Sequence, residues 1–111
     1  MARITMIHHV NVQISDRART REWYERVLGA EFLDRGPALN VRQLQLRLGN
    51  GEIHFTETPR PIAVPSSHFA IEVDDRDGRL ARLDAEGVPS GITRPVSRSP
   101  GRGVRWTAAS R

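Results

Sequence analysis

The sequence predicts an α+β fold built from two tandem copies of one unit, and three observations lead to this prediction. The segment 7-IHHVNVQISDRART-20 recurs, with changes, as 67-SHFAIEVDDRDGR-79. Each copy opens with alternating apolar and polar residues, which is typical of a strand with two unlike faces. Each alternating run is then followed by apolar residues at helical spacing. A chain of 111 residues has room for one small domain of this kind.

The first copy begins with a predicted strand over residues 8–15. Its apolar residues Val10, Val12 and Ile14 alternate with His9, Asn11 and Gln13. A helix is predicted to follow, with Ser15 or Asp16 as its N-cap and Gly29 as the residue that ends it. The buried side of this helix is expected to hold Trp23, Tyr24, Val27 and Leu28.

Three more strands are predicted in the first copy, around 31–33, over 41–48 and over 52–57. The last two are separated by Gly-Asn-Gly, and a turn of this composition between two alternating runs predicts a hairpin. Residues 58–67 contain three prolines and form the predicted linker. The first module is therefore predicted to span residues 1–57, with the order strand, helix and three strands.

The second copy, residues 68–111, repeats this plan. A strand over 68–74 is predicted to lead into a helix from about Asp75 to Glu86, which Gly87 ends. Residues 91–96 and 102–110 are further predicted strands. The fourth strand of the plan is missing, so we expect an incomplete βαββ module.

In each copy the apolar strand face is expected to lie under the helix, while the opposite face is polar. A plain solvent-facing side usually carries more charge than this mixture of Gln, Asn and His. The pattern favours a half-sheltered surface that contacts small polar ligands. The residues of this face are His9, Asn11, Gln13, Gln43, Gln45, Arg47, His54, Thr56, His68 and Glu72.

Three of the four histidines lie on the predicted polar face: His9, His54 and His68. The sequence has no cysteine, so a metal site would use His, Asp or Glu side chains. Imidazole suits zinc, iron, nickel, copper or manganese, and histidines that converge from separate strands would make an open site of the catalytic type. The alternative is that each is a half-buried, hydrogen-bonded strand residue. His8 has the parity of Val10 and is interpreted as a packing or edge residue.

The charge pattern does not favour nucleic acid. All 17 basic residues are arginine, and they alternate with 13 carboxylates along the chain. Aromatic residues make up only 5%, too few for a base-stacking surface. No segment approaches the roughly 20 apolar residues of a membrane helix, so we expect a cytoplasmic protein that binds neither nucleic acid nor membrane.

The motifs I-x-H-V-x-V-x-I-x-D, W-Y-x-x-V-L-G, I-H-F and H-F-A-I-E-V-D-D resemble those of the vicinal oxygen chelate superfamily. This group includes glyoxalase I, bleomycin-resistance proteins, fosfomycin-resistance enzymes, methylmalonyl-CoA epimerases and extradiol dioxygenases. The resemblance runs from Ile4 to about Thr107. It implies two βαβββ modules that form a cup-shaped mixed sheet with the helices outside, and a homodimer whose clefts are shared between the chains.

The resemblance also implies one divalent metal ion (Zn, Ni, Fe or Mn) with ligands in the first and last strands of each module. The matching positions are His9, His68 and His54. The fourth position belongs to a closing strand that this sequence lacks, and Glu72 or Glu52 are candidates for a substitute carboxylate. Without that strand, the edge of residues 68–74 needs a partner chain, a rearranged pairing or solvent, or the chain is a truncated form of a longer product.

These expectations lead to alternative functions. The first is a metal-dependent lyase, isomerase or dioxygenase that acts on a small substrate chelated through vicinal oxygens. The second is a metal-free protein that binds a small molecule or antibiotic, as bleomycin-resistance proteins do. The third is an inactive domain kept for assembly. The candidate substrate-binding residues are Gln45, Arg47, Glu72 and Trp106.

Overall fold

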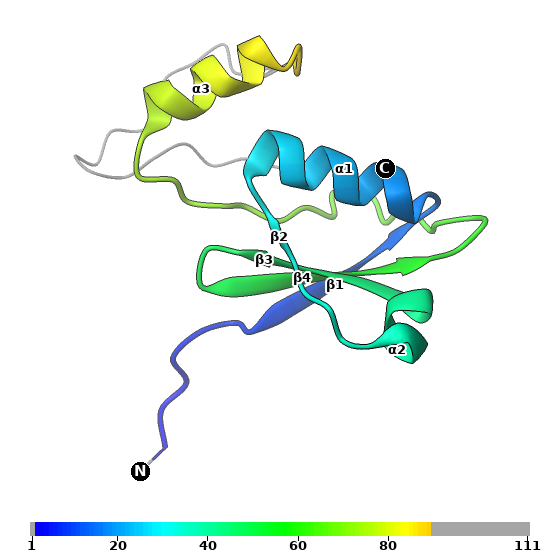
Figure 1. The fold of residues 1–111 in the computed structure, drawn as a ribbon. Helices are drawn as coiled ribbons and strands as arrows, with labels where there is room; N and C mark the ends of the chain where they lie inside the picture. The colour runs from blue at the N-terminus through cyan, green and yellow to red at the C-terminus, as the bar shows by residue number, and fades with distance from the viewer. Residues whose placement is uncertain (1, 90–111) are drawn as a thin grey trace. The chain divides into compact units, whose positions relative to one another are not determined.

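The computed structural model describes residues 2–89, which fall into two compact units, residues 2–64 and residues 65–89. Figure 1 shows the elements of the first unit. They are β1 (His9–Ile14), α1 (Arg17–Leu28), β2 (Glu31–Phe32), α2 (Pro37–Arg42), β3 (Gln43–Leu48) and β4 (Gly51–Glu57). The fold is a mixed α+β fold, as the sequence predicts.

The strands of the first unit form one sheet in the order β1-β4-β3-β2. Strand β4 lies inside the sheet, where it pairs with β1 in parallel and with β3 in antiparallel orientation. In this register His54 of β4 lies opposite Asn11 of β1 and opposite Gln45 of β3. Because side chains alternate along a strand, the polar residues of all three strands share one face and the apolar residues share the other.

The core lies on the apolar face, which α1 covers (Figure 1). Leu44, Leu46, Ile53 and Phe55 are each at most 2% exposed. The ring of Tyr24 on α1 meets the ring of Phe55 edge to face, with 5.0 Å between the centroids. Full burial of such a side chain contributes about 1.5–3 kcal/mol, so these contacts hold the helix on the sheet.

Helix α1 begins and ends where the sequence predicts. The Asp16 carboxylate accepts a hydrogen bond from the backbone N–H of Arg19 at 3.0 Å, which makes Asp16, and not Ser15, the N-cap. At the other end Gly29 has a φ of 68°, a left-handed conformation that glycine adopts without steric cost. Close to the first turn, the Arg21 guanidinium lies 3.9 Å from the centre of the Phe32 ring and connects α1 with β2.

The second unit contains α3 (Arg76–Ala85). Its N-cap is Asp75, whose carboxylate accepts a hydrogen bond from the backbone N–H of Gly78 at 2.9 Å. Asp75 is the residue that the repeat aligns with Asp16, so the two copies begin their helices in the same way. Gly87, which the sequence predicts as the stop, follows the helix with a φ of 69°.

The prediction of a strand over 68–74 is wrong, because these residues form no strand. A strand exists only where a second segment pairs with its backbone, and no segment among residues 2–89 pairs with 68–74. The prediction for 41–48 is wrong at its start, because α2 occupies residues 41 and 42 and β3 begins at Gln43. Pro37 at the first turn favours this unpredicted helix.

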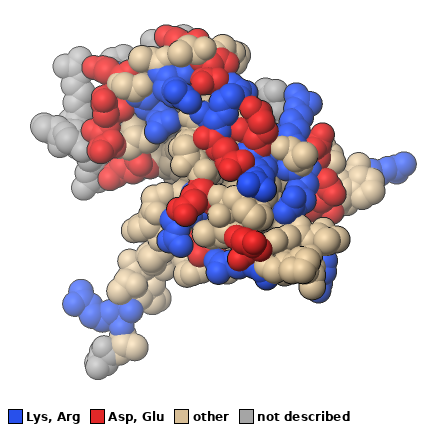
Figure 2. All heavy atoms as spheres, in the orientation of Figure 1, with Lys and Arg blue, Asp and Glu red and all other residues tan. Residues whose placement is uncertain are grey.

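The predicted strands over 91–96 and 102–110 lie outside the described residues. None of the helices between residues 2 and 89 is long and apolar enough to span a membrane. On the face shown in Figure 2, arginine and carboxylate side chains are interleaved.

Tyr24 is the only tyrosine of the chain, and burial raises its pKa from 10.0 to about 12. We expect absorbance at 295 nm to report one ionisation near pH 12. The folded state favours the neutral phenol, so this contribution to stability is complete below pH 10 and is lost as the pH rises towards 12. Denaturant unfolding at a series of alkaline pH values measures the loss, and Tyr24→Phe is the control that removes it. A midpoint near pH 10 in the folded protein would contradict the expectation.

Candidate functional site

The polar face of the sheet brings together two of the three predicted histidine ligands. His9 lies on β1 and His54 on β4, and their rings stack with centroids 4.0 Å apart and planes 17° from parallel. His54 is only 8% exposed, whereas His9 is exposed. Pairing of the two strands in parallel therefore places these imidazoles side by side, as the alternation predicts.

Glu52 lies at the centre of the polar contacts around His54. Its Oε1 atom is 2.8 Å from Nε2 of His54, and Nη2 of Arg35 donates to Oε1 at 3.0 Å and to Oε2 at 3.1 Å. The His54 hydrogen bond, followed by the Arg35 contacts, lowers the pKa of Glu52 against the opposing effect of burial. Glu52 is therefore an ionised carboxylate whose two oxygens both have partners.

Arg35 reaches this face from the loop between β2 and α2. Its Nε donates to Oε1 of Gln45 at 2.9 Å, and Nε2 of Gln45 donates to Oε1 of Gln43 at 2.8 Å. Both Gln45 and His54 are 8% exposed, and buried polar groups of this kind are costly unless they are hydrogen-bonded. The side chains Gln43, Gln45, Arg35, Glu52 and His54 form one continuous chain of contacts, which we call the Glu52 network.

The loop that carries Arg35 is held by its own hydrogen bonds. The Asp34 carboxylate accepts from the backbone N–H of Gly36 at 2.9 Å and from the Asn40 amide at 2.8 Å. These two bonds, the Gly36 bond first, lower the pKa of Asp34. Oδ1 of Asn40 in turn accepts from the backbone N–H of Arg35 at 3.1 Å. The turn fixes the backbone at the residue that contacts Glu52.

His8 was expected to be a packing or an edge residue, and the first of these two alternatives is wrong. His8 precedes β1, and its side chain is 67% exposed. Its Nδ1 lies 3.0 Å from Nδ1 of His9, and its Nε2 lies 3.8 Å from Oε2 of Glu52. The parity of a strand does not apply to a residue that precedes the strand, so the side chain turns towards the polar cluster.

The other predicted site residues lie in different surroundings. Arg47 is on the polar face but is exposed and pairs with Glu31 at 3.8 Å. His68 and Glu72 belong to the unit of residues 65–89, where Nδ1 of His68 lies 2.8 Å from the carbonyl oxygen of Ser66. Trp106 lies outside the described residues.

Arg35 and Glu52 carry most of the contacts, yet neither is among the three histidines that the sequence pattern predicts as ligands. The sequence offers Glu52 as a substitute carboxylate, and its position two residues before His54 is the signal that puts both side chains on the same strand face. Arg35 has no comparable signal, because an irregular loop brings it to the sheet.

The donor atoms of His9 and His54 suit a borderline divalent ion. The lone pair of an imidazole nitrogen lies in the ring plane, so two nearly parallel stacked rings do not aim at one point. No group of three His, Asp or Glu side chains within residues 2–89 is arranged to hold an ion. The donor chemistry therefore fits a metal, and ligation by both histidines requires at least one ring to turn out of the stack.

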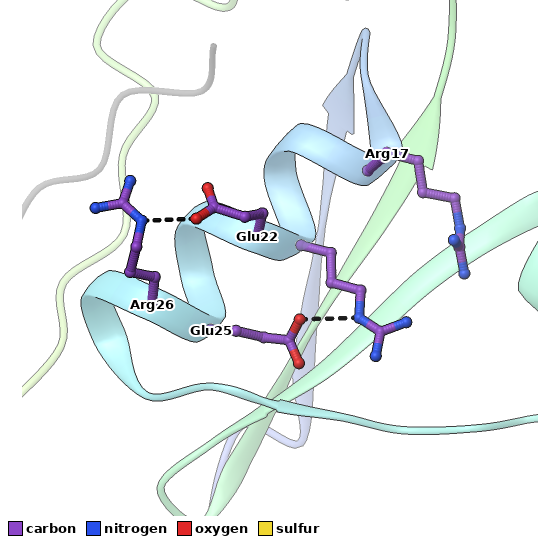
Figure 3. Close-up of a pocket in the computed structure, with 6 residues that line it drawn as sticks. Arg17, Glu22, Glu25 and Arg26 are labelled. Carbon is purple, nitrogen blue, oxygen red and sulfur yellow. Dashed lines mark hydrogen bonds and ion pairs between the residues drawn. The ribbon is translucent and has the colours of Figure 1, made fainter.

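A shallow depression on α1 is separate from this cluster. It lies on the helix that covers the apolar face, away from His54, and four of its five charged side chains form two ion pairs (Figure 3). Arg21 contacts Glu25 at 2.9 Å, and Arg26 contacts Glu22 at 2.7 Å. Pairs at this spacing stabilise a helix by about 0.2–0.5 kcal/mol each, which is a structural role.

A four-stranded mixed sheet with a helix on its apolar face and paired histidines on its polar face defines an α+β protein whose candidate site lies on the open face of the sheet. The chain belongs to the Glyoxalase/Bleomycin resistance protein/Dioxygenase superfamily, whose family model matches residues 6–108. A comparison with curated proteins gave no match.

Solved structures agree with this assignment. A protein assigned to the glyoxalase family from Bacillus anthracis is 24% identical, with a TM-score of 0.67 over 78% of this chain and 74% of that one. Lactoylglutathione lyase from Agrobacterium tumefaciens is 19% identical, with a TM-score of 0.62 over 80% and 75%. A fosfomycin resistance protein from Listeria monocytogenes is 18% identical, with a TM-score of 0.63 over 86% and 76%. At these identities the three structures bear on the fold.

Replacement of Arg35 by leucine should raise the pKa of Glu52 towards its ordinary value of 4.5, because the carboxylate loses its guanidinium partner. Because the pKa of Glu52 is lower in the folded than in the unfolded state, its ionised carboxylate stabilises the fold at pH values above the unfolded-state pKa. This stabilisation is lost as the pH falls through the folded-state pKa. The stability difference between Arg35→Leu and the parent should therefore be larger at neutral pH than in acid. NMR titration of the Glu52 carboxyl carbon measures the first effect, and denaturant unfolding measures the second.

The matched control is Arg47→Leu, which removes an arginine from the same face. Arg47 pairs with Glu31, so its loss should leave the Glu52 titration unchanged. An equal shift in both variants would show that general charge, and not the Arg35 contact, sets the pKa of Glu52.

Proposed function

We propose that this chain is a glyoxalase- or dioxygenase-like metalloprotein that acts on a small substrate chelated through vicinal oxygens, by lyase, isomerase or dioxygenase chemistry. The proposed ligands of its divalent ion (Zn, Ni, Fe or Mn) are His9, His54 and His68. The observation that carries the proposal is the stacking of the His9 and His54 rings on the polar face of the sheet, with 4.0 Å between their centroids. The lactoylglutathione lyase and the fosfomycin resistance protein among the structural neighbours support it.

A bound ion of this kind supplies a Lewis acid that polarises a substrate oxygen. The chain's own residues would bind and orient the substrate on the polar face. The exposed guanidinium of Arg47 is suited to attract an anionic group, and the buried amide of Gln45 holds Arg35 in place. We propose Glu72 and Trp106 as substrate contacts from the second module.

The finer architecture is also part of the proposal. Residues 1–57 would form the first βαβββ module, 58–67 the linker, and 68–111 a second module without its last strand. Together they would form the cup-shaped sheet of the superfamily, with the helices outside. The equivalent caps of α1 and α3, Asp16 and Asp75, support a duplicated unit.

The second candidate is a metal-free protein that binds a small molecule or an antibiotic. The observation in its favour is that Glu52 and Arg35 already satisfy His54 and Gln45, so the cluster is stable without an ion. The polar face would then bind its ligand by hydrogen bonds alone. Metal content distinguishes the two candidates.

We expect protein purified without an affinity tag to bind about one divalent ion per chain, because the proposed site has a single set of ligands. Isothermal titration with zinc, nickel, manganese and iron(II) measures the stoichiometry. His9→Ala, His54→Ala and His68→Ala should each abolish binding.

His8→Ala is the matched control, since it removes an imidazole next to the cluster and keeps all three proposed ligands. It should bind the ion as the parent does. If the parent binds none of the four ions stoichiometrically, the metal proposal fails and the metal-free candidate takes its place.

We also propose a homodimer. Among residues 2–89, strand β1 pairs only with β4, so its outer backbone edge has no strand partner. Val10 on this strand is 38% exposed although it lies on the apolar side of the sheet. An open strand edge with apolar side chains is suited to association.

Light scattering after size exclusion should therefore give twice the mass of the 12.5 kDa chain. Val10→Arg should shift the equilibrium towards monomer, because it places a charge at the proposed contact. Val41→Arg, at a 78% exposed position on α2, should have no effect. A single-chain mass for the parent at micromolar concentration would contradict the proposal.

A further inference from the structure

Glu52 is placed to act on His54 and not as an independent ligand. Both residues lie on β4 with one residue between them, so their side chains rise from the same face of the strand. The two side chains are each 10% exposed, and 2.8 Å separates Oε1 of Glu52 from Nε2 of His54. The contact is short, sheltered and fixed by the pairing of β4 on both sides.

The chemistry of Glu52 and His54 shows which of the two side chains carries the hydrogen between them. Arginine is always charged, and a carboxylate that accepts hydrogen bonds from a guanidinium on both oxygens is ionised. An ionised carboxylate has no proton to donate, so Nε2 of His54 carries the hydrogen. In the neutral imidazole, the lone pair available to a ligand then lies on Nδ1.

The contacts of Arg35 also explain why Glu52 would position His54 and would not bind the ion itself. Nη2 of Arg35 bonds both carboxylate oxygens, and Nε of the same guanidinium is held by Gln45. Oε1 of Glu52 already accepts from both His54 and Arg35, and the guanidinium charge of Arg35 lies against both oxygens, so an ion bound by Glu52 would have to sit beside this positive charge.

We infer that Glu52 is the positioning carboxylate of the site: it holds the Nε2 proton of His54 so that Nδ1 presents the lone pair that binds the ion. The inference rests on the proposed metal function and adds residues to it, since neither Glu52 nor Arg35 is one of the three proposed ligands. Outer carboxylates of this type commonly change metal affinity about 10–100-fold when they are removed.

The first test uses the apo protein and needs no metal. In protein with ¹⁵N-labelled histidine, the Nε2 proton of His54 should give a resolved downfield signal that exchanges slowly with water. Glu52→Gln, which keeps the shape and removes the charge, should speed its exchange or abolish the signal. Glu31→Gln is the matched control, because it removes an exposed carboxylate from β2 and should leave the signal unchanged. A fast-exchanging Nε2 proton in the parent would overturn the inference.

The second test measures zinc affinity by titration calorimetry. Glu52→Gln should bind zinc chloride about 10–100-fold more weakly than the parent, while Glu31→Gln should match the parent. Glu52→Asp keeps the charge but shortens the side chain, and should fall between the two. Circular dichroism melts of each variant separate loss of folding from loss of affinity.

The two tests distinguish the failure of this inference from the failure of the proposed function. Equal zinc affinity in Glu52→Gln and the parent would overturn the positioning role and leave the metal function intact. A parent that binds no zinc, nickel, manganese or iron, yet shows the protected Nε2 proton, would overturn the metal function while the hydrogen bond stands.

Discussion

The structure depends on the pairing of β4 along both of its edges. Because β1 and β3 both bond to its backbone, β4 cannot shift by one residue without exchanging its two faces. Such a shift would expose Ile53 and Phe55 and bury the charged Glu52 against α1. Burial of the core thus fixes the orientation of His54, and the site and the core are two faces of the same strand.

Local patterns predicted this arrangement well where a property of the strand or helix alone decides it. Alternation with a period of two is sufficient to place His9 and His54 on one face, and the structure brings them together. Capping is equally local: an aspartate before a helical run satisfies the first free N–H groups, and both Asp16 and Asp75 do so. These features need no knowledge of distant partners.

The features that the sequence did not reveal depend on distant contacts. Residues 68–74 alternate as well as β1 does, but alternation specifies a face and not a partner, and no pairing forms among the described residues. Arg35 reaches the sheet through a turn fixed by Asp34 and Asn40, in which no regular period applies. The start of β3 differs from the prediction for a related reason: Val41 continues the alternation of the strand, although α2 includes it.

The Glu52 network sets what a ligand must overcome at this face. His54 and Gln45 are nearly inaccessible to water, so their polar atoms need partners whether or not a ligand is bound. The network supplies these partners, since Glu52 contacts Nε2 of His54 and Arg35 donates to Oε1 of Gln45. Nδ1 of His54 takes no part in the network. Ligation at Nδ1 together with His9 requires the exposed His9 ring to turn, which breaks its stack with His54 and its 3.0 Å contact with Nδ1 of His8 but leaves the Glu52 network in place. The energy that orders His54 is contributed by folding, and binding does not have to provide it, which is the physical meaning of a preorganised site.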